Sequence, residues 1–115
     1  MWWNSKIPLP LLASLAGFAL HPAVAAEVCP SRPQHVLRFV DVFDGTPEDQ
    51  ATLMPDKPDK RSGYWRLGYV YDAGRIVTIR CKYDDGQKLD IQLKNRVTRC
   101  DYRRDAKDAL KLYCK

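Results

Sequence analysis

The chain has 115 residues, of which 45% are hydrophobic and 29% are charged, with 19 Lys and Arg against 14 Asp and Glu. Residues 1–26 are much more apolar than the rest, so residues 27–115 form one small domain. A domain of that size excludes a nucleotide-binding α/β fold, a TIM barrel and a second domain.

Residues 1–26 have the order of a secretory signal peptide. Lys6 is followed by an apolar run over 7–20 and by small residues up to Ala26. The run contains two prolines and is shorter than the roughly 20 residues that a membrane-spanning helix needs. We therefore expect a cleavable signal peptide, export, and a mature domain of 27–115 with no transmembrane anchor.

The first half of the mature chain predicts one strand and one helical turn. Prolines at 30 and 33 indicate an extended lead-in, and residues 35–43 are rich in the β-branched and aromatic residues of a strand. Asp44 and Gly45 interrupt that pattern. Residues 46–53 begin with Thr-Pro-Glu-Asp, which predicts a short helical turn, and 54–63 read as a loop.

The second half predicts further strands at 64–71, 75–83, 88–94 and 97–102 from alternating apolar and polar residues. Asp-Gly at 85–86 is a strong hairpin signal. The last piece, 106–114, fits a strand or a helix. These elements predict a mainly β fold: an antiparallel meander of about five to six strands with one short helix.

The four cysteines, Cys29, Cys81, Cys100 and Cys114, all lie in the exported part. An even count in a short exported chain indicates two disulfides, and the wide spacing is not that of a metal site. A hairpin centred near Lys107 places Cys100 opposite Cys114, which leaves Cys29 for Cys81. We expect these two structural pairs and no metal ion or cofactor.

Charge is unevenly distributed along the mature chain. Residues 41–59 contain six acids and one base, whereas 60–115 contain 15 bases and seven acids. Export argues against nucleic acid as the partner of the basic part and favours an anionic envelope component or an acidic protein. An acidic loop braced by a glycine and a proline is suited to project into the cleft of a partner.

The predicted binding residues are four loop positions and two aromatic anchors: Asp44, Gly45, Glu48, Asp49, Trp65 and Tyr69. Trp and Tyr are frequent anchors of protein interfaces, although a single Trp is more often a core residue. His35 is the only histidine after the signal peptide, and no nucleophile, metal or phosphate-loop motif occurs. We therefore expect a protein without catalytic residues.

Several segments carry a resemblance to a known family. They are Cys29-Pro30, residues 42–56 with the sequence VFDGTPEDQATLMPD, and the shorter stretches 65–67, 80–83, 89–93 and Cys100. Together they resemble the small, signal-bearing, cysteine-containing periplasmic proteins of Gram-negative bacteria, some of which are encoded near type VI secretion loci. The resemblance implies an immunity role against a secreted cell-wall amidase.

Two functions from different classes follow. The first is a periplasmic inhibitor or immunity protein that plugs the active site of a secreted peptidoglycan hydrolase with the acidic loop. The second is an envelope-binding module whose basic sheet holds anionic glycan or lipid headgroups. Binding of a polyanion depends steeply on salt, whereas a plugged protein interface depends on it less.

Overall fold

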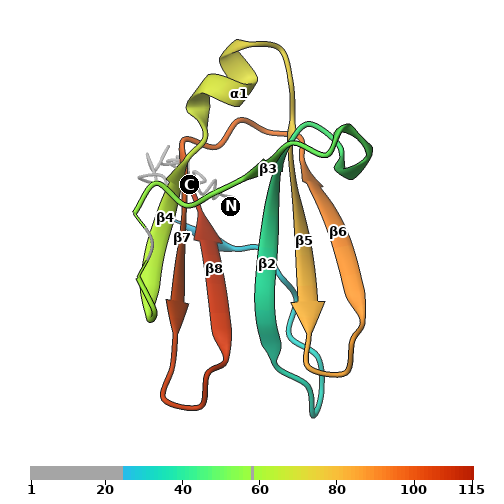
Figure 1. The fold of residues 1–115 in the computed structure, drawn as a ribbon, viewed down its shortest axis with the longest axis vertical. Coiled ribbons are helices and arrows are strands. Elements are labelled where there is room, and N and C mark those ends of the chain that lie inside the picture. The colour runs from blue at the N-terminus through green and yellow to red at the C-terminus, as the bar shows by residue number, and fades with distance from the viewer. Residues whose placement is uncertain (1–24, 58) are drawn as a thin grey trace, which may run out of the picture.

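The computed structural model describes residues 25–57 and 59–115. Eight strands form two antiparallel four-stranded sheets, which we name the first sheet (β1-β8-β7-β4) and the second sheet (β3-β2-β5-β6) (Figure 1). The strands are β1 (Ala26–Glu27), β2 (Leu37–Asp44), β3 (Thr52–Leu53), β4 (Ser62–Arg66), β5 (Val77–Tyr83), β6 (Lys88–Leu93), β7 (Arg99–Arg104) and β8 (Leu110–Cys114). The helical pieces are a 3-10 turn, η1 (Pro47–Asp49), and α1 (Gly68–Asp72).

The mainly β class is confirmed, but the single sheet of five to six strands is wrong. The sequence pattern missed β1 and β3, which have two residues each. Strands this short carry no alternation that a sequence pattern can detect. Of the predicted signal peptide, only Ala25 and Ala26 lie within the described residues. Ala26 belongs to β1 and pairs with Cys114 of β8.

The second sheet follows the predicted strands closely. In β5 the alternating residues Val77, Ile79 and Cys81 are fully buried, and β5 pairs with β2 on one side and β6 on the other. Gly86 adopts a φ of +85° in the hairpin turn between β5 and β6, a conformation that favours glycine. The core face of this sheet is therefore set by the two-residue period of its central strand.

The first sheet settles the ambiguous end of the chain. Leu110–Cys114 is strand β8, which pairs with β7 and places Cys114 directly opposite Cys100. Within β8, Leu110, Leu112 and Cys114 are buried and Lys111 is exposed. The buried residues of this segment thus alternate, and one face of β8 points toward the core.

The predicted strand over residues 64–71 is wrong in its second half. The chain leaves β4 after Arg66 and turns into helix α1. Leu67 and Val70 are both fully buried at a spacing of three, which one helical turn places on the same side and a strand would place on opposite faces. The core therefore selects a helix where the local residues favour a strand.

The predicted helical turn over residues 46–53 is shorter in the structure. It consists of the three-residue η1, after which Gln50 adopts a left-handed φ of +57° and the chain extends into β3. The backbone N–H of Asp44 donates to the carbonyl of Ala51 at 2.9 Å, which fixes this return path beside β2. The result is a tight projecting loop at residues 45–50.

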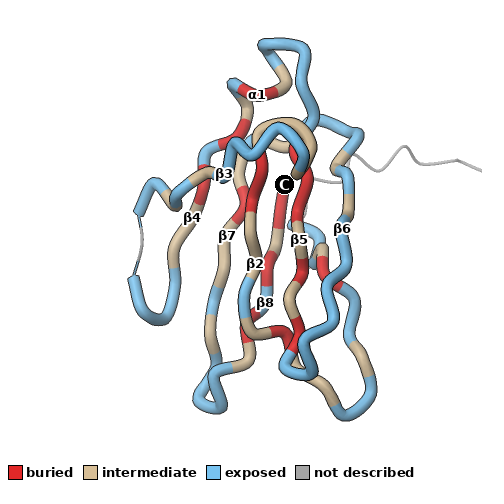
Figure 2. Tube along the Cα trace, turned by 45° about the vertical axis from the view of Figure 1, so that its right-hand side comes forward, coloured by how far each residue is buried: buried red, intermediate tan, exposed pale blue. Residues whose placement is uncertain are grey.

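The two sheets share one hydrophobic core. Val42 and Ile79 of the second sheet belong to the same buried cluster as Trp65 and Leu112 of the first. Strands β2 and β8 are neighbours where the sheets meet (Figure 1). Buried segments lie in the middle of the molecule, and the loops at both ends are exposed (Figure 2).

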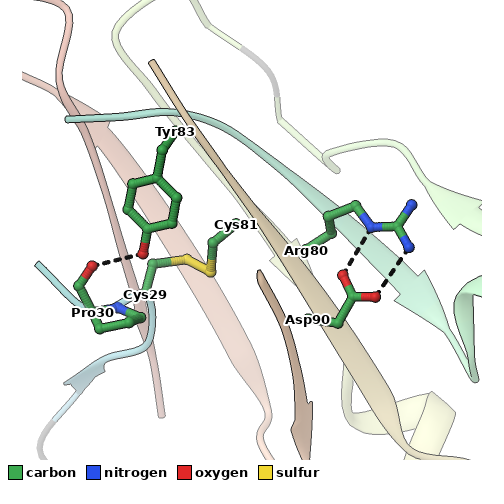
Figure 3. Close-up of a disulfide and its surroundings, with 6 residues drawn as sticks. All are labelled: Cys29, Pro30, Arg80, Cys81, Tyr83 and Asp90. Atoms are coloured by element: carbon green, nitrogen blue, oxygen red, sulfur yellow. Dashed lines mark hydrogen bonds and ion pairs between the residues drawn. A yellow bond between two sulfur atoms is a disulfide. The ribbon is translucent and has the colours of Figure 1, made fainter. Parts of the chain in front are cut away.

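Both expected disulfides are present. Cys29–Cys81 connects the lead-in to the central strand β5, and Cys100–Cys114 connects β7 to β8. Close to the first bond, the Tyr83 hydroxyl donates to the carbonyl of Pro30 at 2.6 Å (Figure 3). The lead-in is thus held on the second sheet by a covalent bond and by a hydrogen bond.

A charged cluster adds a further attachment for the lead-in. Arg32 donates two hydrogen bonds of 2.9 Å to the carboxylate of Asp85, and His35 Nδ1 lies 2.9 Å from Asp84. The hydrogen bonds from Arg32 lower the pKa of Asp85, and the one with His35 lowers the pKa of Asp84. The cluster ties the lead-in to the β5–β6 turn.

The two disulfides predict unequal losses of stability. Cys29–Cys81 spans 52 residues of chain and Cys100–Cys114 spans 14. Because the longer closed loop restricts the unfolded chain more, replacing the first pair by alanine should lower the free energy of unfolding by about 1 kcal/mol more than replacing the second. Urea unfolding of the two double variants measures this difference, and equal or reversed losses would contradict it.

The charged cluster predicts a dependence of stability on acid. Because the pKa of Asp85 is lowered in the folded state, its contribution is complete above the unfolded pKa of about 4 and is lost as the pH falls below it. Arg32→Ala should therefore reduce the free energy of unfolding more at about pH 5 than at about pH 2. Arg103→Ala removes an exposed cation outside this cluster and is the control. It should change the free energy of unfolding by the same amount at both pH values.

Candidate protein-binding surfaces

Four of the six predicted binding residues lie on one projecting loop, and a fifth lies near it. We name the end surface as the residues Asp44–Gln50 together with Tyr69 and Arg75. The loop projects beside β3 at the end of the molecule that carries α1 (Figure 1). Asp44 ends β2, and its carboxylate is bound by Arg75 through contacts of 2.5 and 2.9 Å. Asp44 therefore braces the loop, because its charge is already paired.

The backbone of the loop is fixed at Gly45. Its φ of +99° favours glycine, its N–H donates to Ile76 at 3.0 Å, and its carbonyl accepts from the Thr78 hydroxyl at 2.7 Å. The carboxylate of Asp49 accepts from the Thr46 N–H at 3.1 Å. A Cβ at position 45 would lie 2.7 Å from that carboxylate, so a side chain there would push Asp49 away from its present position.

Glu48 is the acid of this loop that is left for a partner. Its side chain is exposed, and no ion pair joins it to another described residue. Asp44 and Asp49 are both engaged within the loop. The predicted group of acids thus divides into two residues that shape the loop and one that displays its charge.

The two predicted aromatic anchors lie in different places. Tyr69 on α1 is 51% exposed, and partial burial followed by the negative charges of Asp44 and Asp56 raises the pKa of its hydroxyl. Tyr69 therefore lies near the loop as part of the end surface. Trp65 is only 5% exposed, and its indole N–H donates to the carbonyl of Leu53 at 3.1 Å. It is a core residue that reaches the surface only at the base of a groove.

That groove has a volume of about 590 Å³. It runs between β2 of the second sheet and β4, β7 and β8 of the first, below β3. Its walls include two exposed apolar side chains, Phe39 (58% exposed) and Met54 (81% exposed). We name this hollow the sheet groove.

The sheet groove was not predictable from the pattern of the sequence. Phe39 belongs to an apolar run that predicts a buried strand, and Met54 opens a predicted loop. The one indication in the sequence was that the segment of β2 contains more apolar residues than one face of a strand can bury. The pattern could not show it, because the second sheet and the path of β3 were unknown.

Part of the basic segment 60–115 lies on the outer face of the first sheet. There the Tyr64 ring lies 3.8 Å from the guanidinium of Arg99 and 5.6 Å from that of Arg66. A polar depression of about 430 Å³ beside Tyr64 also includes Arg103. Asp101 already binds Arg99 at 2.8 Å, so Arg66 and Arg103 are the cations that this face offers, beside the ring, to an anionic ligand.

Two groups bear on catalysis and on metals. All four cysteines are in disulfides, so none is available as a thiolate nucleophile. His35, Asp84 and Asp85 offer ligand atoms within 4.8 Å of one another, a spacing that could hold a metal ion. The two hydrogen bonds from Arg32 occupy the carboxylate of Asp85, so the cluster is better suited to fastening the lead-in than to binding a cation.

Comparison with known proteins gives one match. The chain matched none of the curated proteins and none of the solved structures with which it was compared. In the described part of the chain, no helix is both long and apolar enough to cross a membrane. Residues 31–115 match the family described as "Type VI secretion system Tli immunity protein". The match covers nearly the whole predicted domain, and the chain belongs to this family of type VI secretion immunity proteins.

Proposed function

We propose that this protein protects its producer by binding a secreted effector hydrolase in the periplasm and covering its active site. Membership of the immunity family supplies the class of partner, a secreted effector. A cell-wall amidase is the effector class that the sequence resemblance implies. Export by a signal peptide over residues 1–26 would place the protein in the compartment where such an enzyme attacks.

The braced loop of the end surface is the observation that carries this proposal. Gly45, the Asp44–Arg75 pair and Asp49 each hold the loop by contacts to fixed partners. A loop that is ordered before binding loses less conformational entropy when it enters a cleft. The disulfides extend the same advantage to the sheet behind it.

The chemistry displayed by the end surface suits an enzyme cleft. Glu48 presents a carboxylate that can pair with a cation or with a protonated histidine of the effector. Tyr69 presents a half-exposed ring with a polar tip, the type of side chain that often dominates binding energy. A projecting acid beside an aromatic anchor can therefore both fill and recognise a concave site.

The direct test uses a secreted effector hydrolase, sought first among the genes next to the one for this protein. The purified mature chain should bind that enzyme with a stoichiometry of about one to one and abolish its activity. Cells that export the enzyme to the periplasm should survive only when they also export this protein. If the protein inhibits an enzyme that does not cleave peptidoglycan, the immunity role stands and the assignment of the effector as an amidase is wrong.

The end surface makes a sharper prediction about single residues. Glu48→Lys should weaken binding of the effector by about tenfold or more, because it replaces an attractive charge in the contact by a repulsive one. Tyr69→Ser should weaken binding by a similar factor. Glu27→Lys, the same change on β1, is the control and should bind like the wild type.

These variants are compared by titration calorimetry and by residual effector activity. Glu48 and Tyr69 are exposed, so neither change should alter the urea midpoint. Wild-type affinity in both variants would remove the end surface from the mechanism.

The basic outer face of the first sheet supports a second candidate, the binding of anionic glycan or lipid headgroups. Arg66, Arg99 and Arg103 lie around Tyr64 on this face. Binding of such a polyanion should fall steeply with added salt and should be lost in Arg66→Ser with Arg103→Ser. Effector binding should survive the same double change, so the two candidates separate in one experiment.

A further inference from the structure

The edge of β2 that faces the sheet groove is only partly covered. On its other side β2 pairs with β5 from Leu37 to Asp44. On the groove side it pairs with β3 only at Val42 and Phe43, because β3 has two residues. Residues 38–41 of β2 therefore lie beyond the last pair with β3, and we name them the free edge.

The hydrogen-bond pattern shows which backbone groups of the free edge face the groove. Asp44 donates its N–H toward β3, to Ala51, whereas Gly45 donates toward the start of β5, to Ile76. Backbone groups alternate in direction along a strand. The N–H and C=O of Val40 consequently point away from β5 and into the sheet groove.

The side chains around the free edge are apolar and exposed. Phe39 and Met54 flank the hollow, and its base is formed by Trp65 and Leu110. An exposed strand edge beside apolar side chains is a ready template for another strand. A segment that entered here would find both backbone partners and an apolar surface.

Arg104 covers one position of this edge in the free protein. Its guanidinium donates to the Arg38 carbonyl at 2.9 Å and lies 5.0 Å from the centre of the Phe39 ring. A strand pairing with the free edge would displace this hydrogen bond, so Arg104 needs a new partner. A carboxylate on the incoming strand supplies one.

Charges on the rim of the groove favour the same kind of ligand. Of the acids there, Asp41 is bound by Lys82 at 2.7 Å, Asp108 lies 3.8 Å from Arg61, and Asp59 accepts from the backbone N–H of Lys60 at 2.6 Å. The guanidinium of Arg104 is held by carbonyl oxygens, which leave its positive charge uncompensated. The rim therefore complements a segment that carries a carboxylate.

We propose that the free edge of β2 receives an extended segment of the effector as an added strand, with an apolar side chain between Phe39 and Met54 and a carboxylate on Arg104. The identity of the partner rests on the proposed function, whereas the site and its mode of binding rest on the geometry of the edge. The effector is then held at two places, by the projecting loop in its cleft and by strand pairing in the sheet groove.

Amide hydrogen exchange, resolved by residue with NMR, tests the strand pairing in the complete mature protein. The Val40 amide should exchange fast in the free protein and become protected in the complex with the effector. The Phe39 and Asp41 amides, which face β5, should be slow in both states. This alternation marks pairing at the edge, because binding through side chains alone does not produce it.

Substitutions test the apolar contacts. Phe39→Ser and Met54→Ser should each weaken effector binding by about tenfold without lowering the urea midpoint, because both side chains are largely exposed in the free protein. Leu89→Ser, a change at an exposed apolar residue of β6, is the matched control and should bind like the wild type.

The outcomes separate this inference from the proposed function. If the wild type binds and inhibits the effector while the Val40 amide stays fast, the strand pairing is wrong and the immunity role stands. If the Val40 amide is protected before the effector is added and this protection rises with protein concentration, a second copy occupies the edge and the inference is overturned. If no effector is bound at all, the proposed function itself fails.

Discussion

The rest of the structure depends on one core that two sheets must share. A domain of this size cannot bury the inner face of each sheet separately, because too much of its surface remains in contact with water. Val42 and Ile79 of the second sheet therefore pack in the same cluster as Trp65 and Leu112 of the first. The disulfides add stability that so small a core does not supply by itself. The outcome is a stiff scaffold whose ends and edges are left to interact.

The scaffold explains why acids close together in the sequence have different roles. Asp44 is the last residue of β2 and binds Arg75, which lies just before the neighbouring strand β5, so its charge is already paired. Asp49 folds back to the N–H of Thr46. Glu48 lies between them in the sequence and remains exposed. A binding loop of this kind gains rigidity from two of its acids and displays the third.

The sequence was most informative where one strand carries a regular pattern. The alternation of Val77, Ile79 and Cys81 predicted β5, and the hairpin geometry of the last cysteines predicted their pairing. It was least informative where distant contacts override local preference. Val70 lies in α1 and Leu67 directly before it because the core needs both on one side, and no neighbour in sequence carries that information. Loop acids could be identified from the sequence alone, but the sheet groove could not, because it exists only between two sheets.

The open part of β2 then has a structural origin. Residues 45–50 must turn tightly for the loop to project, and the returning chain pairs with β2 only at Val42 and Phe43 before it crosses to the first sheet. The chain crosses from β3 to β4 because Trp65 on β4 packs in the shared core. The indole N–H of Trp65 donates to the carbonyl of Leu53 and holds the crossing segment in place. The same path that braces the loop thus leaves the backbone of Val40 without a partner in β3. The projecting loop and the sheet groove therefore both result from the shortness of β3. A partner that contacts the loop lies close to the groove.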